Sequence, residues 1–411
     1  MQYIIKAPAC SSLSADIVLP ASKSISNRVL IMNALAPVKG KLDNVAHCDD
    51  TDVMVKALAS ADSSVVNIGA AGTAMRFLTA YFSQLDGREL VLTGSERMLQ
   101  RPIQILVDAL NSLGASIKYD GQNGFPPLKI SGRKLAGGRI ELDGSVSSQY
   151  ISAMLMAAPL MENGLELVLM NKVVSLPYIQ MTLSLMKQFG IESSWNGNVI
   201  KVCPQTYSPV DFKVESDWSA SSYWFQIAAL MPGSEITLPL LFNNSVQGDS
   251  QIVSLFKPLG VEASFCGDSV VLKSSKPKVD KYEVNLVEQP DLAQTFVVTC
   301  CMLGVQFCFS GLDNLKIKET DRIAALIAEM AKLGYVLTEP AAGALAWNGE
   351  RCEAMKCPVI STYKDHRMAM AFAPAAVLIG DLAVDDPSVV SKSYPGYWDD
   401  LKKAGFSVIS K

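Results

Sequence analysis

The sequence is poor in charge and contains almost no histidine. Charged residues make up 18% of the 411 residues, where a typical soluble domain has about 25%. Its 49% hydrophobic residues and net charge of −4 exclude an intrinsically disordered chain. The net charge also argues against a general nucleic-acid binder, which needs a basic excess. With only His47 and His366, the chain is too poor in histidine for a histidine-based metal cluster.

The sequence also lacks any C-x-x-C pair among its nine cysteines. This pattern argues against both a disulfide framework and a zinc site. We expect buried, reduced thiols, no metal and no cofactor. The first ten residues, MQYIIKAPAC, have no basic region followed by an apolar one, so no signal peptide is predicted. These observations favour a cytoplasmic protein.

Two long uncharged stretches are the only candidates for membrane spans. Leu292–Leu312 is long enough to cross a bilayer, but five polar residues interrupt it and Gly304 lies near its middle. We expect it to form a buried helix, a turn and a strand. Gly144–Met161 is expected to form a buried helix that ends near Pro159. Neither stretch predicts a membrane protein.

A pattern of amphipathic helix, glycine and strand recurs along the whole chain. Its glycines are Gly114, Gly190, Gly260, Gly334 and Gly405, at spacings of 76, 70, 74 and 71 residues. A glycine after a helix is common because it adopts the left-handed conformation without strain, but capping does not explain the constant spacing. A sixth copy has Ala59 in place of the glycine. The repeat predicts six α/β modules, three in each of two domains.

Four predicted helices carry an arginine in or near the first turn. Because the helix N-terminus is partially positive, arginine is unfavourable there unless an anion compensates it. The arginines and their expected N-caps are Arg28 with Ser24, Arg76 with Thr73, Arg322 with Thr320, and Arg367 with Asp365. Solvation, or pairing with local acids such as Asp321, would explain one such helix more easily than four. We interpret the set as an anion site of backbone N–H groups, hydroxyls and guanidinium groups.

Further cations and hydroxyls support an anion site. They are the arginines Arg97 and Arg101, the helix start Ser147-Ser148-Gln149, and Lys392. In addition, Gly72 would allow an anion to approach the backbone closely. No segment has the Gly-Lys-Ser/Thr ending of a P-loop, so nucleotide hydrolysis is not predicted. The number of cations favours ligands that carry phosphate and carboxylate groups.

Nine short motifs, read in order, identify a family. They are SKSISNR, GAAGTAMR, Arg101-Pro102, DGSVSSQ, SLPY, QGD, KETDR, DHRMAM and KSYP. In this order they resemble the 3-phosphoshikimate 1-carboxyvinyltransferase (EPSP synthase) family. The resemblance implies a two-domain inside-out α/β barrel of six βαβαββ units, three per domain. It implies one discontinuous domain of 1–19 and 217–411, an inserted domain of 20–216, and an active site in the cleft between them.

The resemblance also implies the reaction and its residues. The family transfers the enolpyruvyl group of phosphoenolpyruvate to the 5-hydroxyl of shikimate 3-phosphate and releases phosphate. The implied shikimate 3-phosphate ligands are Lys23, Ser24, Arg28, Ser147, Ser148, Gln149, Ser175, Tyr178, Asp291, Asn314 and Lys318. The implied phosphoenolpyruvate ligands are Lys23, Gly72, Arg101, Gln149, Arg322, Arg367 and Lys392. Asp291, Glu319 and Lys23 are the candidate catalytic residues, with Glu319 otherwise explicable as a partner of Lys318. We expect a monomer without nucleic-acid or membrane partners.

Some residues depart from the family's pattern. The family usually has G-N-A-G-T-A-M-R-P, whereas this chain has Ala70 and Phe77 at the second and last positions. Leu176, Leu315 and Lys316 also replace residues common in the family. Because Ala70 and Phe77 lie near the implied phosphoenolpyruvate pocket, our hypothesis is a competent enzyme that binds analogues such as glyphosate more weakly than usual.

Three alternatives remain beside this interpretation. UDP-N-acetylglucosamine 1-carboxyvinyltransferase shares the implied fold and donor, but it typically has Asn after the first lysine and a loop cysteine near the donor. Here Ser24 follows Lys23, and no cysteine lies between Cys48 and Cys203. An enzyme of RNA termini would need a basic surface. A catalytically inactive metabolite-binding protein would not require the intact Lys23, Asp291 and Glu319.

Overall fold

The chain forms two compact units. The computed structural model describes residues 1–60, 63–145, 147–171 and 173–411. Unit 1 comprises Met1–Pro20 and Glu215–Lys411, and unit 2 comprises Ala21–Val214. The chain therefore leaves unit 1 after Pro20 and returns to it at Glu215, where the sequence suggested crossings after residues 19 and 216.

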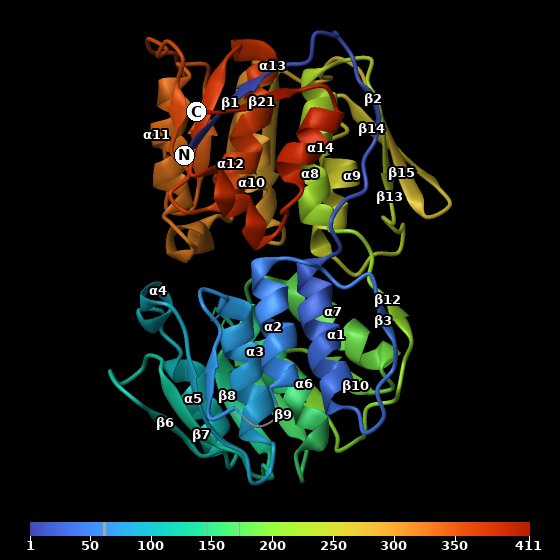
Figure 1. The fold of residues 1–411 in the computed structure, drawn as a ribbon, viewed down its shortest axis with the longest axis vertical. Coiled ribbons are helices and arrows are strands. Elements are labelled where there is room, and N and C mark those ends of the chain that lie inside the picture. Colours follow the sequence, from blue (N-terminus) through green and yellow to red (C-terminus); the bar gives the residue numbers. More distant parts are fainter. Residues whose placement is uncertain (61–62, 146, 172) are drawn as a thin grey trace. The chain divides into compact units, whose positions relative to one another are not determined.

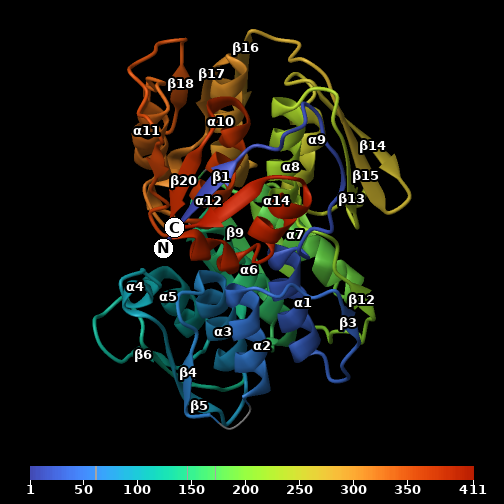
Figure 2. The same cartoon turned by 45° about the horizontal axis from the view of Figure 1, so that its top comes forward.

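Unit 1 contains three sheets. Its strands are β1 (Gln2–Lys6), β2 (Ser14–Asp16), β13 (Glu235–Pro239), β14 (Val261–Cys266), β15 (Ser269–Ser274), β16 (Lys281–Asn285), β17 (Gln306–Ser310), β18 (Leu345–Trp347), β19 (Val359–Ile360), β20 (Leu382–Asp385) and β21 (Ser407–Ser410). The sheet orders are β19-β20-β1-β21, β14-β15-β13-β2 and β16-β17-β18. The N-terminal strand β1 lies between β20 and β21, antiparallel to both. Figure 1 shows β1 beside β21, and Figure 2 shows it beside β20. The start of the chain thus completes a sheet made by its end.

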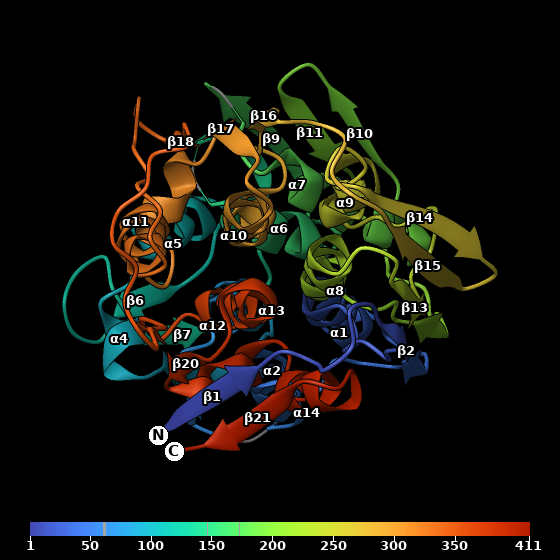
Figure 3. The same ribbon diagram turned by 90° about the horizontal axis from the view of Figure 1, so that it is seen from above.

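The interior of unit 1 is formed by some of its helices. The helices of this unit are α8 (Trp218–Leu230), α9 (Ile252–Leu255), α10 (Ala293–Leu303), α11 (Arg322–Lys332), α12 (His366–Phe372), α13 (Ala376–Ile379) and α14 (Tyr397–Lys403), with 3₁₀ turns η2 (Gly248–Gln251), η3 (Pro290–Leu292), η4 (Asp313–Ile317), η5 (Ala373–Ala375) and η6 (Pro387–Lys392). Figure 3 shows α8, α10 and α12 together, with the sheets around them. All of α8 except Ser219 and all of α10 except Leu303 are buried. A helix that is buried all round needs apolar residues on every face, which explains the long uncharged stretches.

Unit 2 repeats this plan. Its strands are β3 (Leu42–Asp43), β4 (Val65–Asn67), β5 (Glu89–Thr93), β6 (Ile117–Tyr119), β7 (Leu128–Ser131), β8 (Gly138–Asp143), β9 (Leu165–Met170), β10 (Ser193–Asn196), β11 (Val199–Val202) and β12 (Phe212–Lys213). Its helices are α1 (Lys23–Leu35), α2 (Asp49–Ala59), α3 (Gly72–Ser83), α4 (Glu96–Leu99), α5 (Gln104–Ser112), α6 (Ser148–Ala157), the 3₁₀ turn η1 (Ala158–Leu160) and α7 (Leu176–Gln188). The sheets are β4-β5-β7-β6, β10-β11-β9-β8 and β12-β3, so the described residues form three sheets in each unit. Helix α3 packs on α6, and α6 packs on α7.

Four of the recurring glycines end a helix, and Gly260 ends the turn that follows α9 in the same geometry. Gly114, Gly190, Gly260, Gly334 and Gly405 have φ angles between 82° and 103°. In each case the next residue donates a backbone hydrogen bond to the carbonyl five residues earlier, for example Ala115 to Leu110. This is the Schellman motif, which needs a left-handed residue after the helix. The sixth copy, at Ala59, runs into residues 61–62, outside the described residues.

Both predictions for the uncharged stretches are confirmed. Leu292–Leu312 contains helix α10, the left-handed Gly304 and strand β17, and Gly144–Met161 contains the buried helix α6. Within the described residues, no helix is both long enough and apolar enough to cross a membrane. The expectation of buried thiols was wrong for most cysteines. All nine are free, but Cys10, Cys203, Cys266, Cys352 and Cys357 are exposed, because they lie in loops or at a strand end rather than in the core.

Candidate active site

All four arginine-bearing helices form, but only one of the expected caps is correct. Asp365 caps α12 and accepts a hydrogen bond from the Arg367 N–H at 2.9 Å. Helix α1 is capped by Ser22 rather than Ser24, and α11 by Asp321 rather than Thr320. Helix α3 begins at Gly72 without any side-chain cap, so Thr73 is not its cap. Each of these three expected caps lies one or two residues from the observed N-cap position. Ser and Thr side chains suit several positions around a helix start, so the sequence does not fix the cap.

Arg28 is buried in unit 2 among neutral groups. Its Nε donates to Thr182 Oγ1 at 2.8 Å, and its Nη atoms donate to Ser152 Oγ at 3.2 Å and to the Ser24 carbonyl at 2.9 Å. Its guanidinium lies 5.4 Å from the centre of the Phe77 ring. Arg28 thereby joins α1 to α6 and α7. Burial lowers its pKa to about 10, although Tyr178 acts in the opposite direction.

Arg76 is a second buried cation of this kind. It donates to the carbonyls of Gly72 and Pro102, while its Nε has no partner among the described residues. Burial lowers its pKa to about 10, and the charge of Arg101 adds to this effect. None of the contacts described for Arg28 or Arg76 is with a carboxylate. A buried charge is stable only when it is compensated, so these two arginines favour an anion as the missing partner.

The start of α3 lies against Arg101. A Cβ atom at Gly72 would be 2.6 Å from Nη1 of Arg101, so only glycine leaves that guanidinium in place. Beside it, Thr73 Oγ1 accepts a hydrogen bond from Nε2 of Gln149 at 3.1 Å. Thr73, expected to cap the helix, instead orients a predicted ligand. Gly72 and Arg101 thus lie together, with Gln149 beside them at Thr73.

The other predicted residues of unit 2 lie at the starts of α1, α6 and α7. Ser147 caps α6, Ser148 is buried in its first turn, and Tyr178 lies in the first turn of α7. Ser175 precedes α7 with a φ of 54°. A non-glycine residue in this region is strained, and such strain concentrates at functional sites. The Tyr178 ring lies 5.9 Å from the Arg28 guanidinium.

Lys23 is paired with a residue that sequence reasoning missed. Its Nζ lies 3.2 Å from Oδ2 of Asp50, which is buried in the first turn of α2. Asp49 and Asp52 share that turn, where the helix dipole favours negative charge. The run of aspartates at the start of α2 was the available signal. Asp50 thus holds the lysine expected to contact both substrates.

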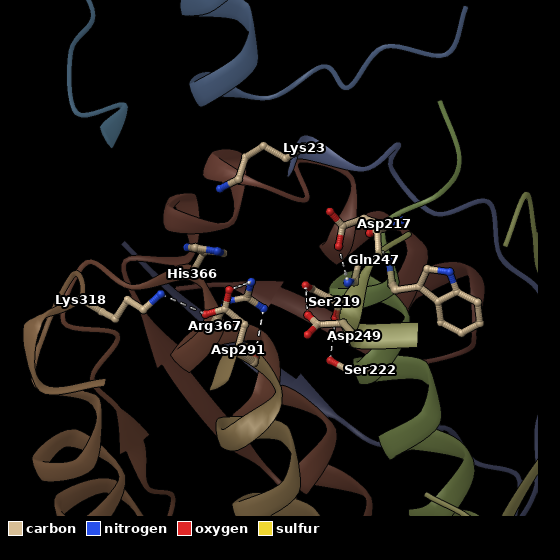
Figure 4. A network of polar contacts seen from close by, with 12 residues as sticks. Lys23, Asp217, Ser219, Ser222, Gln247, Asp249, Asp291, Lys318, His366 and Arg367 are labelled. Atoms are coloured by element: carbon tan, nitrogen blue, oxygen red, sulfur yellow. Dashed lines mark hydrogen bonds and ion pairs between the residues drawn. The ribbon is translucent and has the colours of Figure 1, made fainter. Parts of the chain in front are cut away.

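In unit 1 the predicted residues form one network of charges. Arg322 is its centre and is 2% exposed: its nitrogens lie 2.7 Å from Asp365, 3.0 Å from Asp291 and 3.1 Å from Glu319. Lys392 Nζ lies 2.7 Å from Glu319, and Arg367 Nη2 lies 3.1 Å from Asp291. Lys318 reaches Asp291 at 3.8 Å. Figure 4 shows Lys318 and Arg367 on either side of Asp291. The fully buried Asp365, expected only to cap α12, also fixes Arg322.

The network decides the charge of the two candidate catalytic carboxylates. Burial opposes the ionisation of Asp291, but Arg367, Lys318 and Arg322 outweigh it and hold its pKa well below the usual value. Burial likewise opposes the ionisation of Glu319, and Arg322 and Lys392 hold its pKa well below the usual value. Both groups are therefore ionised at neutral pH and act as hydrogen-bond acceptors. Glu319 is no surface partner of Lys318.

Asn314 completes the predicted set. It lies in η4, and its Oδ1 is buried without a hydrogen-bond partner in the described part of the chain. A buried acceptor left without a donor costs about 1–3 kcal/mol, so a ligand hydroxyl is a natural partner. No cluster of metal-ligating residues is found among the described residues.

Comparison with known proteins places the chain in one family. The family model of EPSP synthase (3-phosphoshikimate 1-carboxyvinyltransferase) matches residues 8–61 and 56–401. A 3-phosphoshikimate 1-carboxyvinyltransferase of Bacteroides fragilis is 56% identical over 409 residues, covering 99% of both chains. One of Vibrio atlanticus is 36% identical over 426 residues, covering 95% of this chain and 96% of its own.

Solved structures agree on the fold. An EPSP synthase of Acinetobacter baumannii has a TM-score of 0.82 at 20% sequence identity, and the match covers both chains completely. The two-domain α/β fold expected from the sequence is therefore confirmed. With the family model matching most of the chain and a relative 56% identical over nearly its full length, the chain belongs to the EPSP synthase (3-phosphoshikimate 1-carboxyvinyltransferase) family.

Proposed function

We propose that this chain transfers the enolpyruvyl group of phosphoenolpyruvate to the 5-hydroxyl of shikimate 3-phosphate, giving 5-enolpyruvylshikimate 3-phosphate and phosphate. The observation that carries the proposal is the arrangement of cations around Asp291 and Glu319. Three cations hold the Asp291 carboxylate, and Arg322 and Lys392 hold Glu319. Such a cluster suits a reaction between two anionic substrates, in which cations bind the anions and carboxylates transfer protons.

Each substrate is assigned to residues of both units. Shikimate 3-phosphate is assigned to Lys23, Ser24, Arg28, Ser147, Ser148, Gln149, Ser175 and Tyr178 of unit 2 and to Asp291, Asn314 and Lys318 of unit 1. Phosphoenolpyruvate is assigned to Lys23, Gly72, Arg101 and Gln149 of unit 2 and to Arg322, Arg367 and Lys392 of unit 1. The absence of carboxylates from the contacts described for Arg28 supports a phosphate there. The proposal requires that both units supply ligands.

Asp291 is assigned the role of base for the attacking hydroxyl. The hydroxyl oxygen bonds to C2 of phosphoenolpyruvate, its proton passes to Asp291, and C3 gains a proton to become a methyl group. In the second half, a proton leaves that methyl group and the bond between C2 and the phosphate oxygen breaks. The ionised state of Asp291 in the free protein suits the first of these steps.

Glu319 and Lys23 are assigned the proton transfers at carbon. Glu319 is ionised in the free protein because Arg322 and Lys392 hold it. Anions that bind these two cations weaken their hold on Glu319 and raise its pKa, since opposite charges stabilise the ionised form. Substrate binding therefore prepares Glu319 to carry a proton. The same cations then stabilise the negative charge that develops in the transition state.

Phosphate release measured with each acceptor tests the function. We expect release from phosphoenolpyruvate with shikimate 3-phosphate and none with UDP-N-acetylglucosamine. Glu319→Gln should lower kcat by about 10²–10⁴-fold, the usual contribution of a positioned acid or base. Lys278→Gln, in an exposed ion pair of unit 1, is the matched control with unchanged kcat. Phosphate release with UDP-N-acetylglucosamine but not with shikimate 3-phosphate would overturn the assignment of substrate. Normal turnover of Glu319→Gln would overturn the role of Glu319.

We further assign the chain to the cytoplasm as a monomer. A reducing compartment is compatible with nine unpaired cysteines, five of them exposed. Sedimentation at micromolar concentration tests the oligomeric state, and a stable dimer would contradict it.

A further inference from the structure

Asp249 is a buried carboxyl group beside the network that the proposed reaction does not use. It lies in η2 and is 5% exposed. The hydroxyl of Ser219, in the first turn of α8, donates a hydrogen bond to its Oδ2. In Figure 4 its carboxyl group lies below Ser219, on the side that faces Arg367 and Asp291.

The turn that carries Asp249 is fixed to both neighbouring elements. Gln247, just before η2, accepts a hydrogen bond from the Trp218 N–H at 3.1 Å, which ties it to the start of α8. The Gly248 carbonyl accepts one from Gln289 Nε2 at 3.4 Å, two residues before Asp291. The turn that carries Asp249 is thus fixed by Trp218, which precedes Ser219, and by Gln289, which lies two residues before Asp291.

The charges that face Asp249 come from three elements. Asp291 of η3 and Asp217, the cap of α8, are negative, and Arg367 of α12 is positive. Burial raises the pKa of Asp249 to about 7, and repulsion by Asp291 acts in the same direction. Arg367 and the Ser219 hydroxyl act in the opposite direction. Two carboxyl groups that repel each other across one cation do not ionise independently.

We propose that Asp249 is a positioning residue that sets the strength of Asp291 as a base through their shared neighbour Arg367. The inference rests on the proposed role of Asp291. When Asp249 is protonated, Arg367 interacts with Asp291 alone and holds its carboxylate as a weak base. When Asp249 is ionised, it attracts Arg367 and repels Asp291, so that Asp291 accepts the hydroxyl proton more readily. Asp249 itself forms and breaks no bond in the reaction.

The pH profile of Asp249→Asn tests the proposal, because asparagine keeps the shape of the side chain without its charge. The kcat/KM of the wild type should rise as the pH passes through about 7, where Asp249 ionises. In Asp249→Asn this rise should be absent. At pH 8 its kcat/KM should be lower than that of the wild type, by up to about tenfold for each unit by which the pKa of Asp291 falls. Substrate phosphates titrate near pH 6 but contribute equally to both profiles. An identical rise in both proteins would overturn the proposal.

Two serines of α8 provide a second variant and a control. Ser219→Ala removes the hydroxyl that stabilises ionised Asp249, so the rise should move to higher pH without disappearing. Ser222→Ala is the matched control, because its hydroxyl donates to the Ser219 carbonyl rather than to Asp249, and its profile should match the wild type. A profile of Ser219→Ala that matches the wild type would count against the pairing with Asp249.

Thermal unfolding gives a test that does not depend on activity. The pKa of Asp249 is higher in the folded protein than the value of about 4 in an unfolded chain. The folded state therefore binds the extra proton between pH 4 and 7, and stability falls as the pH rises through this range. Relative to Asp249→Asn, the wild type should lose stability between these pH values. A constant difference would overturn the assigned titration, whereas an unchanged pH profile of kcat/KM in Asp249→Asn, with the predicted stability difference intact, would count only against the role in catalysis.

Discussion

At the scale of single residues, the two units treat their buried cations differently. Arg28 and Arg76 of unit 2 are held by hydroxyls, carbonyls and aromatic rings, whereas Arg322 is surrounded by three carboxylates. An anion that approaches Arg28 or Arg76 meets a charge with no carboxylate among its described contacts. An anion that approaches unit 1 competes with the catalytic carboxylates for their cations. The arrangement in unit 2 favours anion binding. The arrangement in unit 1 links anion binding to the proton affinity of Asp291 and Glu319.

Gly72→Ala should weaken the binding of phosphoenolpyruvate without unfolding the protein. The new Cβ would lie 2.6 Å from Nη1 of Arg101, and the end of a long side chain can move away at little cost. Loss of a hydrogen bond to a charged group costs about 1.5–3 kcal/mol, so KM for phosphoenolpyruvate should rise by about 10–100-fold with an unchanged melting temperature. Gly121→Ala is the control, since its Cβ would lie 3.6 Å from Pro127. An unchanged KM would show that Arg101 does not bind this substrate.

The inhibition constant for glyphosate tests the departures at Ala70 and Phe77. Phe77 is buried, with its ring 5.4 Å from the Arg28 guanidinium, so it supports a proposed shikimate 3-phosphate ligand. Ala70 lacks the amide that usually stands at that position. We expect a higher inhibition constant than that of a family member with the full G-N-A-G-T-A-M-R-P motif, assayed side by side. An equal or lower constant would contradict the hypothesis.

Sequence reasoning found residues with a rare local signature and missed those defined by distant contacts. The arginines at helix starts could be found because the pattern conflicts with the helix dipole. Asp50 and Asp249 could not be assigned, because their importance depends on Lys23 and on Ser219 and Asp291, which lie elsewhere in the sequence. An aspartate before or within the first turn of a helix is too common to indicate a site by itself.

At the scale of elements, the recurring glycines have different surroundings. Gly405 has a φ of 88°, and a Cβ there would meet only Pro8, at 3.5 Å. A Cβ at Gly260 would lie 2.4 Å from the carbonyl oxygen of Ser275, which directly follows β15 and donates its own N–H to the Gly260 carbonyl. The first glycine is required for its backbone conformation alone. The second is required also for the close approach of two segments.

Alanine at these two positions should separate the contributions. Gly405→Ala should lower the free energy of unfolding by about 1–2 kcal/mol, the cost of a left-handed residue with a Cβ. Gly260→Ala should lower it further, because the backbone of β15 and the following loop must also shift. Chemical denaturation of both variants, with Gly121→Ala as control, measures the difference. Equal losses at the two positions would show that the carbonyl contact at Gly260 is relieved without cost.

The order of the elements could be predicted, but most of the sheet pairings could not. Helix, glycine and strand follow one another locally, so their periodicity is readable from the sequence. Strand β2 pairs with β13 in the register Ser14 to Glu235, and β1 pairs with both β20 and β21. Such pairings join segments far apart in the chain, and hydrophobic alternation does not specify the partner. Only the resemblance to a family indicated that the N-terminal strand belongs to the C-terminal domain.

At the scale of the whole molecule, the small net charge does not show that charged groups are concentrated in one buried network. The chain carries 36 basic and 40 acidic residues, yet the acids of the network in unit 1 are buried beside cations that hold them ionised. Many other ion pairs, such as Lys278 with Glu262, are exposed. Exposed pairs contribute little to stability. The electrostatic part of stability should therefore depend mainly on the buried network.

Acid should weaken the protein through this network. The pKa values of Asp291 and Glu319 are lower in the folded protein than in the unfolded chain, so their contribution is complete above the unfolded values of about 4 and is lost as the pH falls through the folded ones. Below pH 4 the melting temperature of the wild type should fall more steeply than that of Glu319→Gln, which has lost one of the two groups. The control is Glu235→Gln, in an exposed pair with Lys273, which should retain the slope of the wild type. Equal slopes for Glu319→Gln and the wild type would show that Glu319 is not held ionised by Arg322 and Lys392, and with that result the proposed link between substrate binding and its pKa would fail as well.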